Sequence, residues 1–381
     1  MHQKRLGLLK NTNKIVPYQH LSLVLIILFG LLTACSTSKE QKIKKEVNVI
    51  DEMVELIHTE VDSQYVYDYE KTKYVPSNGK TLLIQGQTYE SIHEYKDYFK
   101  YQNYPGAWSA YWAVTQSTGI TESFKNVTGS TQNHKYLVDE FPNMALHSAM
   151  WMVGKWGVDE DTYNGIYDFV IKDFSAWVKT VDRPVYLRIG YEFDGPHNQL
   201  EPEGYIRAYR HIVDLMRSEG VNNVAYVWHS YASKTYKGYP VSDWYPGDDY
   251  VDWVGISVFF QPYSGIQHKE TNDVLEFARI HKKPVMIAEA NPVKGIGKKG
   301  KKEWDEWFAN FFTFTYSKNI KAISFINEDW TRLSIDGIEE WKDARLYNNE
   351  LISKAWLKET EKKRYLKQSP ELYAELGYPD N

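Results

Sequence analysis

Eight short apolar runs recur along the chain from about residue 80 onward, and each is followed by a polar or aromatic loop and then by a helical pattern. Runs of this length that alternate with helical segments indicate strand and helix units of a parallel sheet. The alternation therefore predicts a fold of the α/β class. The runs are residues 81–84, 107–114, 144–153, 184–189, 224–228, 251–258, 284–288 and 321–326.

Amphipathic patterns between these runs predict the helices. Residues 163–178 and 204–219 carry apolar side chains at three- and four-residue spacing, and Gly220 follows the second segment as a helix-ending glycine. Another helix is expected from Thr271 as its N-cap, and a further one through residues 304–312. Eight such units predict a (β/α)8 TIM barrel, for which ~250 residues is typical. The alternative is a doubly wound open sheet, but no nucleotide-binding P-loop accompanies it.

The charge balance and the cysteine count exclude several classes of protein. The chain has 45 Lys and Arg against 50 Asp and Glu, without a basic tract, which argues against a nucleic-acid binder. A single cysteine excludes an internal disulfide and a cysteine-rich zinc site, and no metal-binding motif occurs, so we expect no metal and no cofactor. Aromatic residues make up 15% of the chain, which favours a sugar-binding protein, although such side chains also fill cores.

The N-terminus has the pattern of a secretion signal. Residues 1–20 are basic without an acidic residue, and residues 21–32 form an apolar stretch that is short for a spanning helix, which needs ~20 residues. The next residues, Leu32-Thr33-Ala34-Cys35, resemble the lipobox of bacterial lipoproteins. The resemblance implies that Cys35 is lipidated and that the protein is a cell-envelope lipoprotein of a bacterium, held to the membrane by its lipid.

We therefore predict four segments along the chain. Residues 1–34 are a lipoprotein signal peptide, and residues 35–75 are the lipidated cysteine with a tether. Residues 76–350 form the barrel as a single domain, and residues 351–381 form a C-terminal helical tail. We expect a monomer.

Two glutamates close two of the predicted strands. Glu192 ends the fourth run and Glu289 ends the seventh, and catalytic groups in such barrels come from the C-terminal ends of strands. Strand alternation places Glu192 on one face with Gly190 and Arg188, and Glu289 on one face with Val285 and Ile287. Both carboxylates can then point into the barrel mouth. A protonated and an ionised carboxyl facing each other are what the cleavage of a glycosidic bond requires.

The residues around these glutamates resemble a known family. Residues 187–195, which read LRIGYEFDG, and Ile287-Ala288-Glu289 are most similar to clan A glycoside hydrolases of family 26, the relatives of mannanases, lichenases and β-1,3-xylanases. The resemblance covers roughly residues 80–350. It implies that Glu192 is the acid/base and Glu289 the nucleophile of a retaining enzyme. The sequence departs from the family at Tyr191, where family 26 has histidine, and at Ala290-Asn291, where Phe-Gly is frequent.

Several polar and aromatic residues near the strand ends are candidates for binding substrate. Arg188 either holds a catalytic carboxylate ionised or forms a structural ion pair lower in the barrel, and His229 either binds substrate or positions Glu192. Glu328 and Asp329, after the eighth run, are rivals of the catalytic pair. The substrate-binding candidates are His229, Tyr263, Trp330, Arg188, Tyr191, Asn198 and Trp108.

The sequence thus predicts a retaining, endo-acting glycoside hydrolase that cleaves a β-linked polysaccharide. Two alternatives stay open. One is a glycan-binding surface lipoprotein without catalysis, and the other is a transglycosylase that uses the same two glutamates.

Overall fold

Eight parallel strands close into a barrel in the computed structural model, which describes residues 39–69, 72–335 and 337–379. Neighbouring strands pair in chain order, and β10 pairs with β1 to close the ring. Each of the eight predicted runs supplies one barrel strand, which confirms the (β/α)8 fold. The strands are β1 (Thr81–Gly86), β2 (Ala107–Ala113), β5 (Ala145–Trp151), β6 (Val185–Ile189), β7 (Val224–Ser230), β8 (Trp253–Val258), β9 (Val285–Ala290) and β10 (Ala322–Ile326).

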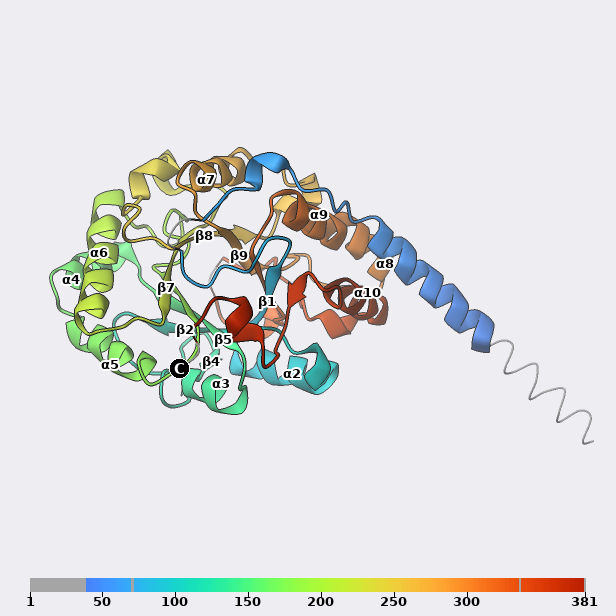
Figure 1. The fold of residues 1–381 in the computed structure, drawn as a ribbon, viewed down its shortest axis with the longest axis horizontal. Coiled ribbons are helices and arrows are strands. Elements are labelled where there is room, and N and C mark those ends of the chain that lie inside the picture. Colours follow the sequence, from blue (N-terminus) through green and yellow to red (C-terminus); the bar gives the residue numbers. More distant parts are fainter. Residues whose placement is uncertain (1–38, 70–71, 336, 380–381) are drawn as a thin grey trace, which may run out of the picture. The chain divides into compact units, whose positions relative to one another are not determined.

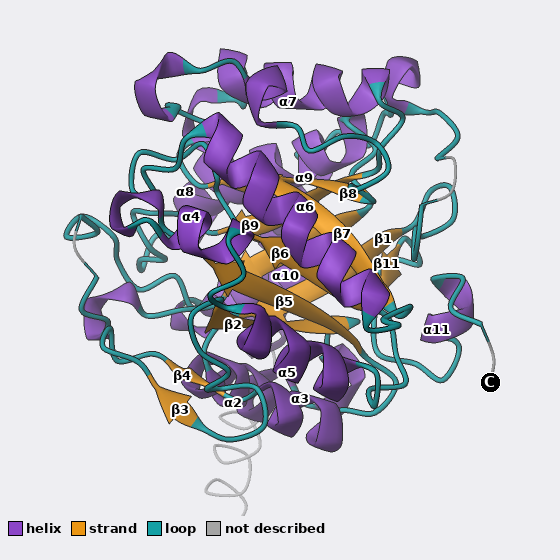
Figure 2. Cartoon of the chain, turned by 90° about the vertical axis from the view of Figure 1, so that its left-hand side faces the viewer, coloured by secondary structure: helices purple, strands orange, loops and turns teal. Residues whose placement is uncertain are grey.

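Helices surround the strands, as Figures 1 and 2 show. Short strands β3 (Phe124–Lys125) and β4 (Thr131–Gln132) form a separate antiparallel pair. The helices are α2 (Tyr89–Phe99), α3 (His134–Glu140), α4 (Val158–Tyr163), α5 (Asp168–Val178), α6 (Pro202–Ser218), α7 (Lys269–Ile280), α8 (Gly300–Glu303), α9 (Ala309–Ser317), α10 (Glu350–Thr360) and α11 (Leu372–Glu375).

Two predicted helices begin or divide differently from the sequence pattern. The segment 163–178 is split, because the chain turns at Gly165 with a φ of 82° between α4 and α5. Helix α7 begins at Lys269 rather than after Thr271. The Thr271 hydroxyl instead donates to the carbonyl of Ala232 at 2.8 Å, which ties α7 to the loop after β7.

The barrel interior is filled by side chains from every strand. Small and large residues share one buried cluster that runs across the barrel. This cluster shows which strand positions face inward, since alternate residues of a strand point to opposite faces. The strand residues in it are Leu82, Ile84, Ala107, Ala145, Tyr186, Ala225, Val227, Trp253, Met286, Ala288 and Ala322.

The N-terminal ends of the strands are covered by two segments from far apart in the sequence. Trp253 and Tyr186 donate hydrogen bonds to the carbonyls of Lys73 and Tyr74, at 2.9 and 2.6 Å. On the other side, β11 (Tyr365–Leu366) pairs in parallel with the start of β1. A hollow of about 1080 Å³ lies at this end of the barrel, opposite the two glutamates, and residues 72–78 and 376–379 line part of it.

The predicted segment boundaries at 75 and 350 both fall inside one compact unit, residues 51–381. Residue 350 is the first residue of α10, and the segment after it contains the rest of that helix, β11 and α11, with β11 paired to β1 of the barrel. Cys35 and the predicted signal peptide lie outside the described residues. Within the described ranges, no helix is both long and apolar enough to cross a membrane.

Candidate active site

Glu192 reaches the barrel mouth through a turn rather than through strand alternation. Strand β6 ends at Ile189, and Gly190 and Glu192 then adopt positive φ angles of 54° and 53°. A left-handed conformation is uncommon for a residue other than glycine, and it turns the chain sharply here. The amide of Asn198 donates to the carbonyls of Tyr191 and Glu192, at 2.8 and 3.0 Å, and fixes the turn. The prediction that strand alternation places Glu192 on the same face as Arg188 was therefore wrong, because β6 ends before Glu192 and the turn directs its side chain.

Glu289 points into the mouth because β9 carries one extra residue. Ile256 of β8 pairs with Ile287, but the next residue, Ser257, pairs with Glu289, so Ala288 has no partner in the ladder. Such a bulge changes the alternation and aims the following side chain in a new direction. The inward residues of β9 before the bulge are Met286 and Ala288, not the predicted Val285 and Ile287.

The Glu289 carboxylate is held by two donors from strands that are not adjacent to β9. The hydroxyl of Tyr111, on β2, donates to Oε1 at 2.6 Å, and the guanidinium of Arg188, on β6, forms an ion pair with the same oxygen. Arg188 is fully buried and also donates to Ser109 at 3.3 Å. Of the two predicted roles for Arg188, the structure shows contact with the carboxylate.

The Glu192 carboxylate has a different set of partners. Its Oε1 accepts from the Ser257 hydroxyl at 2.5 Å, and its Oε2 lies 2.8 Å from Nε2 of His197. Ser257 is in turn 3.0 Å from Nε2 of His229. Nδ1 of His229 lies 3.4 Å from Arg188, which can only donate, so Nε2 of His229 carries the hydrogen and donates to Ser257. One hydrogen-bonded chain thus joins the two carboxylates through Arg188, His229 and Ser257.

The electrostatic surroundings of Glu289 and His229 shift the pKa values of the two groups in opposite directions. Burial raises the pKa of Glu289, the charge of Arg188 opposes that rise, and the charge of Glu192 adds to it. The effect of one carboxylate on the other shows that they are close enough to interact. Burial and the adjacent Arg188 charge keep the pKa of His229 well below its ordinary value, so this ring is neutral at pH 7.

The predicted substrate-binding residues fall into two groups. His229 is buried with both ring nitrogens engaged, and Asn198 is buried under the turn, so both act on the position of Glu192. Trp108 is a correction, because its side chain is buried on the helix side of β2 and packs against Tyr95 and Phe141. Its neighbours Ser109 and Tyr111 point inward instead, which follows from the twofold alternation of the strand.

The other three predicted residues lie around the mouth. The ring of Tyr191 stands edge-on to that of Tyr111, with centroids 5.3 Å apart. Tyr263 and Trp330 belong to one apolar cluster in the loops after β8 and β10. Trp330 contacts Trp341 edge-on at 4.7 Å, and its indole nitrogen is buried without a hydrogen bond among the described residues. These positions are compatible with a sugar subsite and stay predictions.

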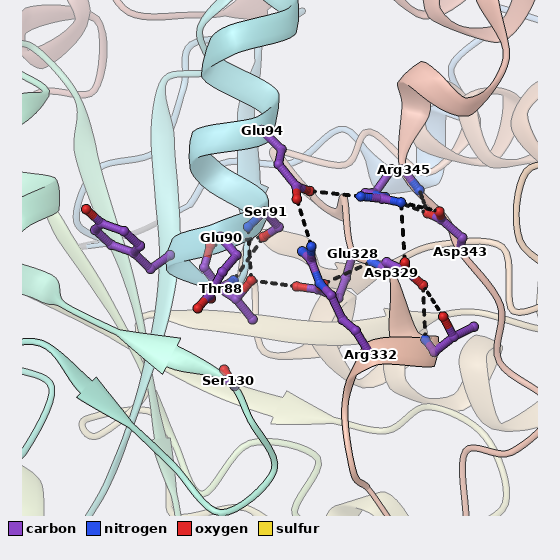
Figure 3. Close-up of polar contacts among 12 residues, drawn as sticks. Thr88, Glu90, Ser91, Glu94, Ser130, Glu328, Asp329, Arg332, Asp343 and Arg345 are labelled. Carbon is purple, nitrogen blue, oxygen red and sulfur yellow. Dashed lines mark hydrogen bonds and ion pairs between the residues drawn. The ribbon is translucent and has the colours of Figure 1, made fainter.

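Glu328 and Asp329, the rivals of the catalytic pair, are held in ion pairs (Figure 3). Glu328 accepts a hydrogen bond from Thr88 at 2.6 Å and pairs with Arg332 at 2.7 Å. Asp329 pairs with Arg345 at 3.3 Å. Both carboxylates are thus bound by arginines of the loop after β10 and tie that loop together.

Comparison with known proteins shows which family the region around this site resembles. The sequence profile of glycosyl hydrolase family 26 matches residues 179–340, a range that contains both glutamates. The chain resembles glycosyl hydrolase family 26 in sequence and in fold. It is therefore a glycoside hydrolase, as the resemblance of the motifs implied.

Two named relatives match different shares of this chain. The beta-1,3-xylanase TXYA of a Vibrio species is 29% identical over 331 residues, which cover 80% of this chain and 70% of the relative. A mannan endo-1,4-beta-mannosidase of Thermothelomyces thermophilus is 26% identical over 199 residues, 48% of this chain and 39% of the relative. Among solved structures, a GH26 beta-mannanase from Bacteroides ovatus superposes with a TM-score of 0.54 and 16% identity, covering 86% and 96% of the two chains, and shows the shared fold.

Within the described part of the chain, no three His, Cys, Asp or Glu side chains are grouped in a way that could hold a metal ion. Residues 295–300 spell G-x-G-x-x-G, a pattern known from nucleotide sites. Here it lies in the loop after β9, before the four-residue α8, and a side chain at Gly295 would meet the carbonyl of Asp343 at 2.6 Å. This glycine serves close packing of two loops.

Three residues that contact the carboxylates were missed in the sequence. Tyr111 and Ser257 are polar residues inside apolar strand runs, and that interruption is the signal that could have found them. His197 gave no comparable signal, because its approach to Glu192 depends on the fold of a loop. The sequence indicates the ends of strands more clearly than it indicates which residues contact the glutamates at those ends.

Proposed function

We propose that this glycoside hydrolase cleaves internal links of a β-linked polysaccharide with retention of configuration, with Glu192 as acid/base and Glu289 as nucleophile. The observation that carries the proposal is the pair of buried carboxylates at the C-terminal ends of β6 and β9, with different partners. Glu289 is bound by a cation and a hydroxyl, whereas Glu192 is bound by a serine and a histidine that exchanges protons near neutral pH.

The contacts of Glu289 suit a nucleophile. Arg188 and Tyr111 both bind Oε1 and stabilise the ionised form. Among the contacts of the described residues, Oε2 is left to form the bond to C1 of the sugar. In the first step the C1–O bond to the leaving sugar breaks, its electron pair stays on the oxygen, and Glu192 supplies the proton.

The second step reverses the role of Glu192. Water attacks C1, the bond to Glu289 breaks with its electron pair returning to the carboxylate, and Glu192 takes the proton of the water. Two inversions at C1 give overall retention. Because Glu192 must give and take one proton in each cycle, its two oxygens need partners that tolerate both states, and a serine hydroxyl and an imidazole do so.

For the substrate, β-1,3-xylan is the first choice. The relatives that match 80% of this chain carry the name beta-1,3-xylanase, whereas the named mannosidase matches 48%. An exposed tryptophan next to the site offers a surface on which further sugar units of a longer substrate can stack. Trp156 is 60% exposed, lies 5.6 Å from Trp151, and follows β5 beside the loop that carries Asn198, whose carbonyl binds Gly154 at 3.0 Å. Indole rings stack on the apolar faces of sugars.

The test incubates the purified protein with β-1,3-xylan, β-mannan, mixed-linkage glucan and an algal galactan, and follows reducing ends and product lengths. We expect internal cleavage of one glycan, and a loss of about 10³-fold in kcat for Glu192→Gln and Glu289→Gln. Glu201→Gln is the matched control, because Glu201 is a half-exposed surface glutamate paired with Lys237. Near-normal turnover in Glu289→Gln would sink the assignment.

The roles of the two glutamates are separated by azide and an activated aryl glycoside of the cleaved sugar. Glu192→Ala with azide should yield the β-glycosyl azide, since the nucleophile still acts, and Glu289→Ala should yield the α-azide by direct attack. The opposite pattern would exchange the two roles. Glycan binding without any reducing ends would favour the binding-protein alternative, and products longer than the substrate would favour the transglycosylase.

We further propose that the protein is a bacterial cell-envelope lipoprotein anchored through Cys35, acting as a monomer. The support is the basic start, the apolar stretch 21–32 and the lipobox-like residues before the sole cysteine. Partition of the protein between detergent and water, with and without Cys35→Ser, tests the anchor. Light scattering tests the monomer, and a dimer would refute it.

A further inference from the structure

His197 contacts the proposed acid/base directly. Its Nε2 lies 2.8 Å from Oε2 of Glu192, while the side chain is 47% exposed at the mouth and that of Glu192 is 8% exposed. The other oxygen of Glu192 is taken by Ser257. His197 is therefore the partner of the acid/base that faces solvent, where a substrate chain would arrive.

The loop is built so that this contact can form. An alanine side chain at Gly195 would lie 2.4 Å from Cε1 of His197, so only glycine lets the imidazole fold back over the turn. The ring packs edge-on against Tyr231, with centroids 5.4 Å apart at 82°. Asn198, next in sequence, binds two carbonyls of the turn. The position of His197 is thus fixed on three sides.

The charged groups that face His197 come from three elements. Glu192 and Asp194 lie on its own loop, Glu289 on β9, and His229 on β7. Burial lowers the pKa of His197, but the hydrogen bond and the charge of Glu192 outweigh burial, and the two other carboxylates add to them, so the pKa is raised. The neutral state of His229 leaves this balance in place near pH 7.

We propose that His197 is a positioning residue that stores the proton which Glu192 donates to the leaving sugar. The inference rests on the proposed role of Glu192. In the resting enzyme the imidazolium of His197 pairs with ionised Glu192. The one proton that His197 and Glu192 share is thus available for the leaving sugar, while Glu289 stays ionised and attacks C1.

The proton balance closes over one cycle. Nε2 of His197 passes its proton to Oε2 of Glu192, and Glu192 passes it to the glycosidic oxygen as that oxygen leaves C1 with its bonding electrons. The water that attacks C1 in the second step gives one proton to Glu192, which returns it to His197. The hydroxyl of that water ends on the sugar, and the two products together have gained one water molecule.

The pH profile of kcat/KM distinguishes a stored proton from a merely structural contact. Adding a second basic site to an acid raises the pH at which the pair loses its last proton, because the pair titrates as one unit. The ordinary pKa values of histidine and glutamic acid differ by about 2 units. We therefore expect the alkaline limb of His197→Gln to move down by about 1–2 pH units on β-1,3-xylooligosaccharides. Gly195→Ala, which keeps but displaces the histidine, should move the limb in the same direction.

A leaving group that needs no proton provides the second measurement. On a 2,4-dinitrophenyl β-xylobioside, His197→Gln should keep kcat/KM within about threefold of the wild type at pH 7, while activity on the natural glycan falls. The matched control is His211→Gln, because His211 forms the same kind of pair with Asp168, at 2.6 Å, on the outer helices. That variant should have the wild-type profile.

The inference is overturned if the alkaline limb of His197→Gln stays in place or moves to higher pH. A move to higher pH is what results from removing a cation that only holds Glu192 ionised. The proposed function is judged separately. Loss of activity in Glu192→Gln with an unmoved limb in His197→Gln refutes the proton store alone, whereas an active Glu192→Gln refutes both.

Discussion

Replacing Tyr111 with phenylalanine removes one atom from the environment of the proposed nucleophile. The hydroxyl donates to Oε1 of Glu289 at 2.6 Å, inside the barrel, and burial keeps the pKa of Tyr111 well above its ordinary value, so it always donates. The bond favours the ionised form of Glu289. Its removal raises the pKa of that carboxylate, and a larger share of the enzyme is protonated and inactive at low pH.

The magnitude follows from the kind of bond. A hydrogen bond to a charged group contributes about 1.5–3 kcal/mol, and one pKa unit corresponds to about 1.4 kcal/mol. The acid limb of kcat/KM should therefore move up by about 1–2 pH units in Tyr111→Phe. Activity at pH values below the limb falls about 10- to 100-fold, and the value at higher pH recovers. Arg188 still binds the carboxylate, so the enzyme is not abolished.

The assay is a pH series of initial rates on the cleaved oligosaccharide, with denaturant unfolding in parallel. Tyr186→Phe is the matched control, because the Tyr186 hydroxyl is equally buried and donates at the same 2.6 Å, but to the carbonyl of Tyr74 at the closed end of the barrel. It should lower the free energy of unfolding by about 1 kcal/mol and leave the pH profile unchanged. An acid limb that stays in place in Tyr111→Phe would refute the reasoning.

Two further predictions concern stability and attachment. Burial raises the pKa of Asp194 to about 6, above its unfolded value, so ionisation of this group lowers the free energy of unfolding by up to about 3 kcal/mol as pH rises from about 4 to 6. In a series of urea denaturations across this pH range, Asp194→Asn should lose that decrease. Equal slopes for the variant and the wild type would contradict the prediction. Cys35→Ser should move the protein from the detergent phase to the aqueous phase, and unchanged partition would exclude the lipid anchor.

The sequence predicted where the two candidate glutamates lie, but not the directions in which their side chains point. Apolar runs and their ends are local properties of the chain, so Glu192 and Glu289 could be placed at the barrel mouth without a structure. The direction of Glu289 depends on the unpaired Ala288, which appears only when β9 is aligned with β8 and β10. Register between strands is a tertiary property, and strand periodicity alone does not reveal a bulge.

The same limit explains the error over Trp108. In β2 both faces are buried, so the run has no polar face to reveal which residues point inward. The pattern therefore does not distinguish Trp108, the second residue of β2, from the inward Ser109 and Tyr111. Tyr111 is an aromatic residue that contacts the site, and it does so through its hydroxyl, which donates to the buried carboxylate of Glu289.

The pairing of β11 with β1 affects how the protein can be made. Arg364, just before β11, binds the Thr81 hydroxyl at the start of β1, a contact between residues 283 positions apart. Contacts of such separation form late, since the intervening chain must first be ordered. A ribosome that has released the first seven strands has therefore released a sheet with an uncovered edge. Synthesis must reach residue 326 before β10 can pair with both β9 and β1, and residue 366 before β11 can cover the start of β1. Until the ring closes, the growing chain is exposed to aggregation.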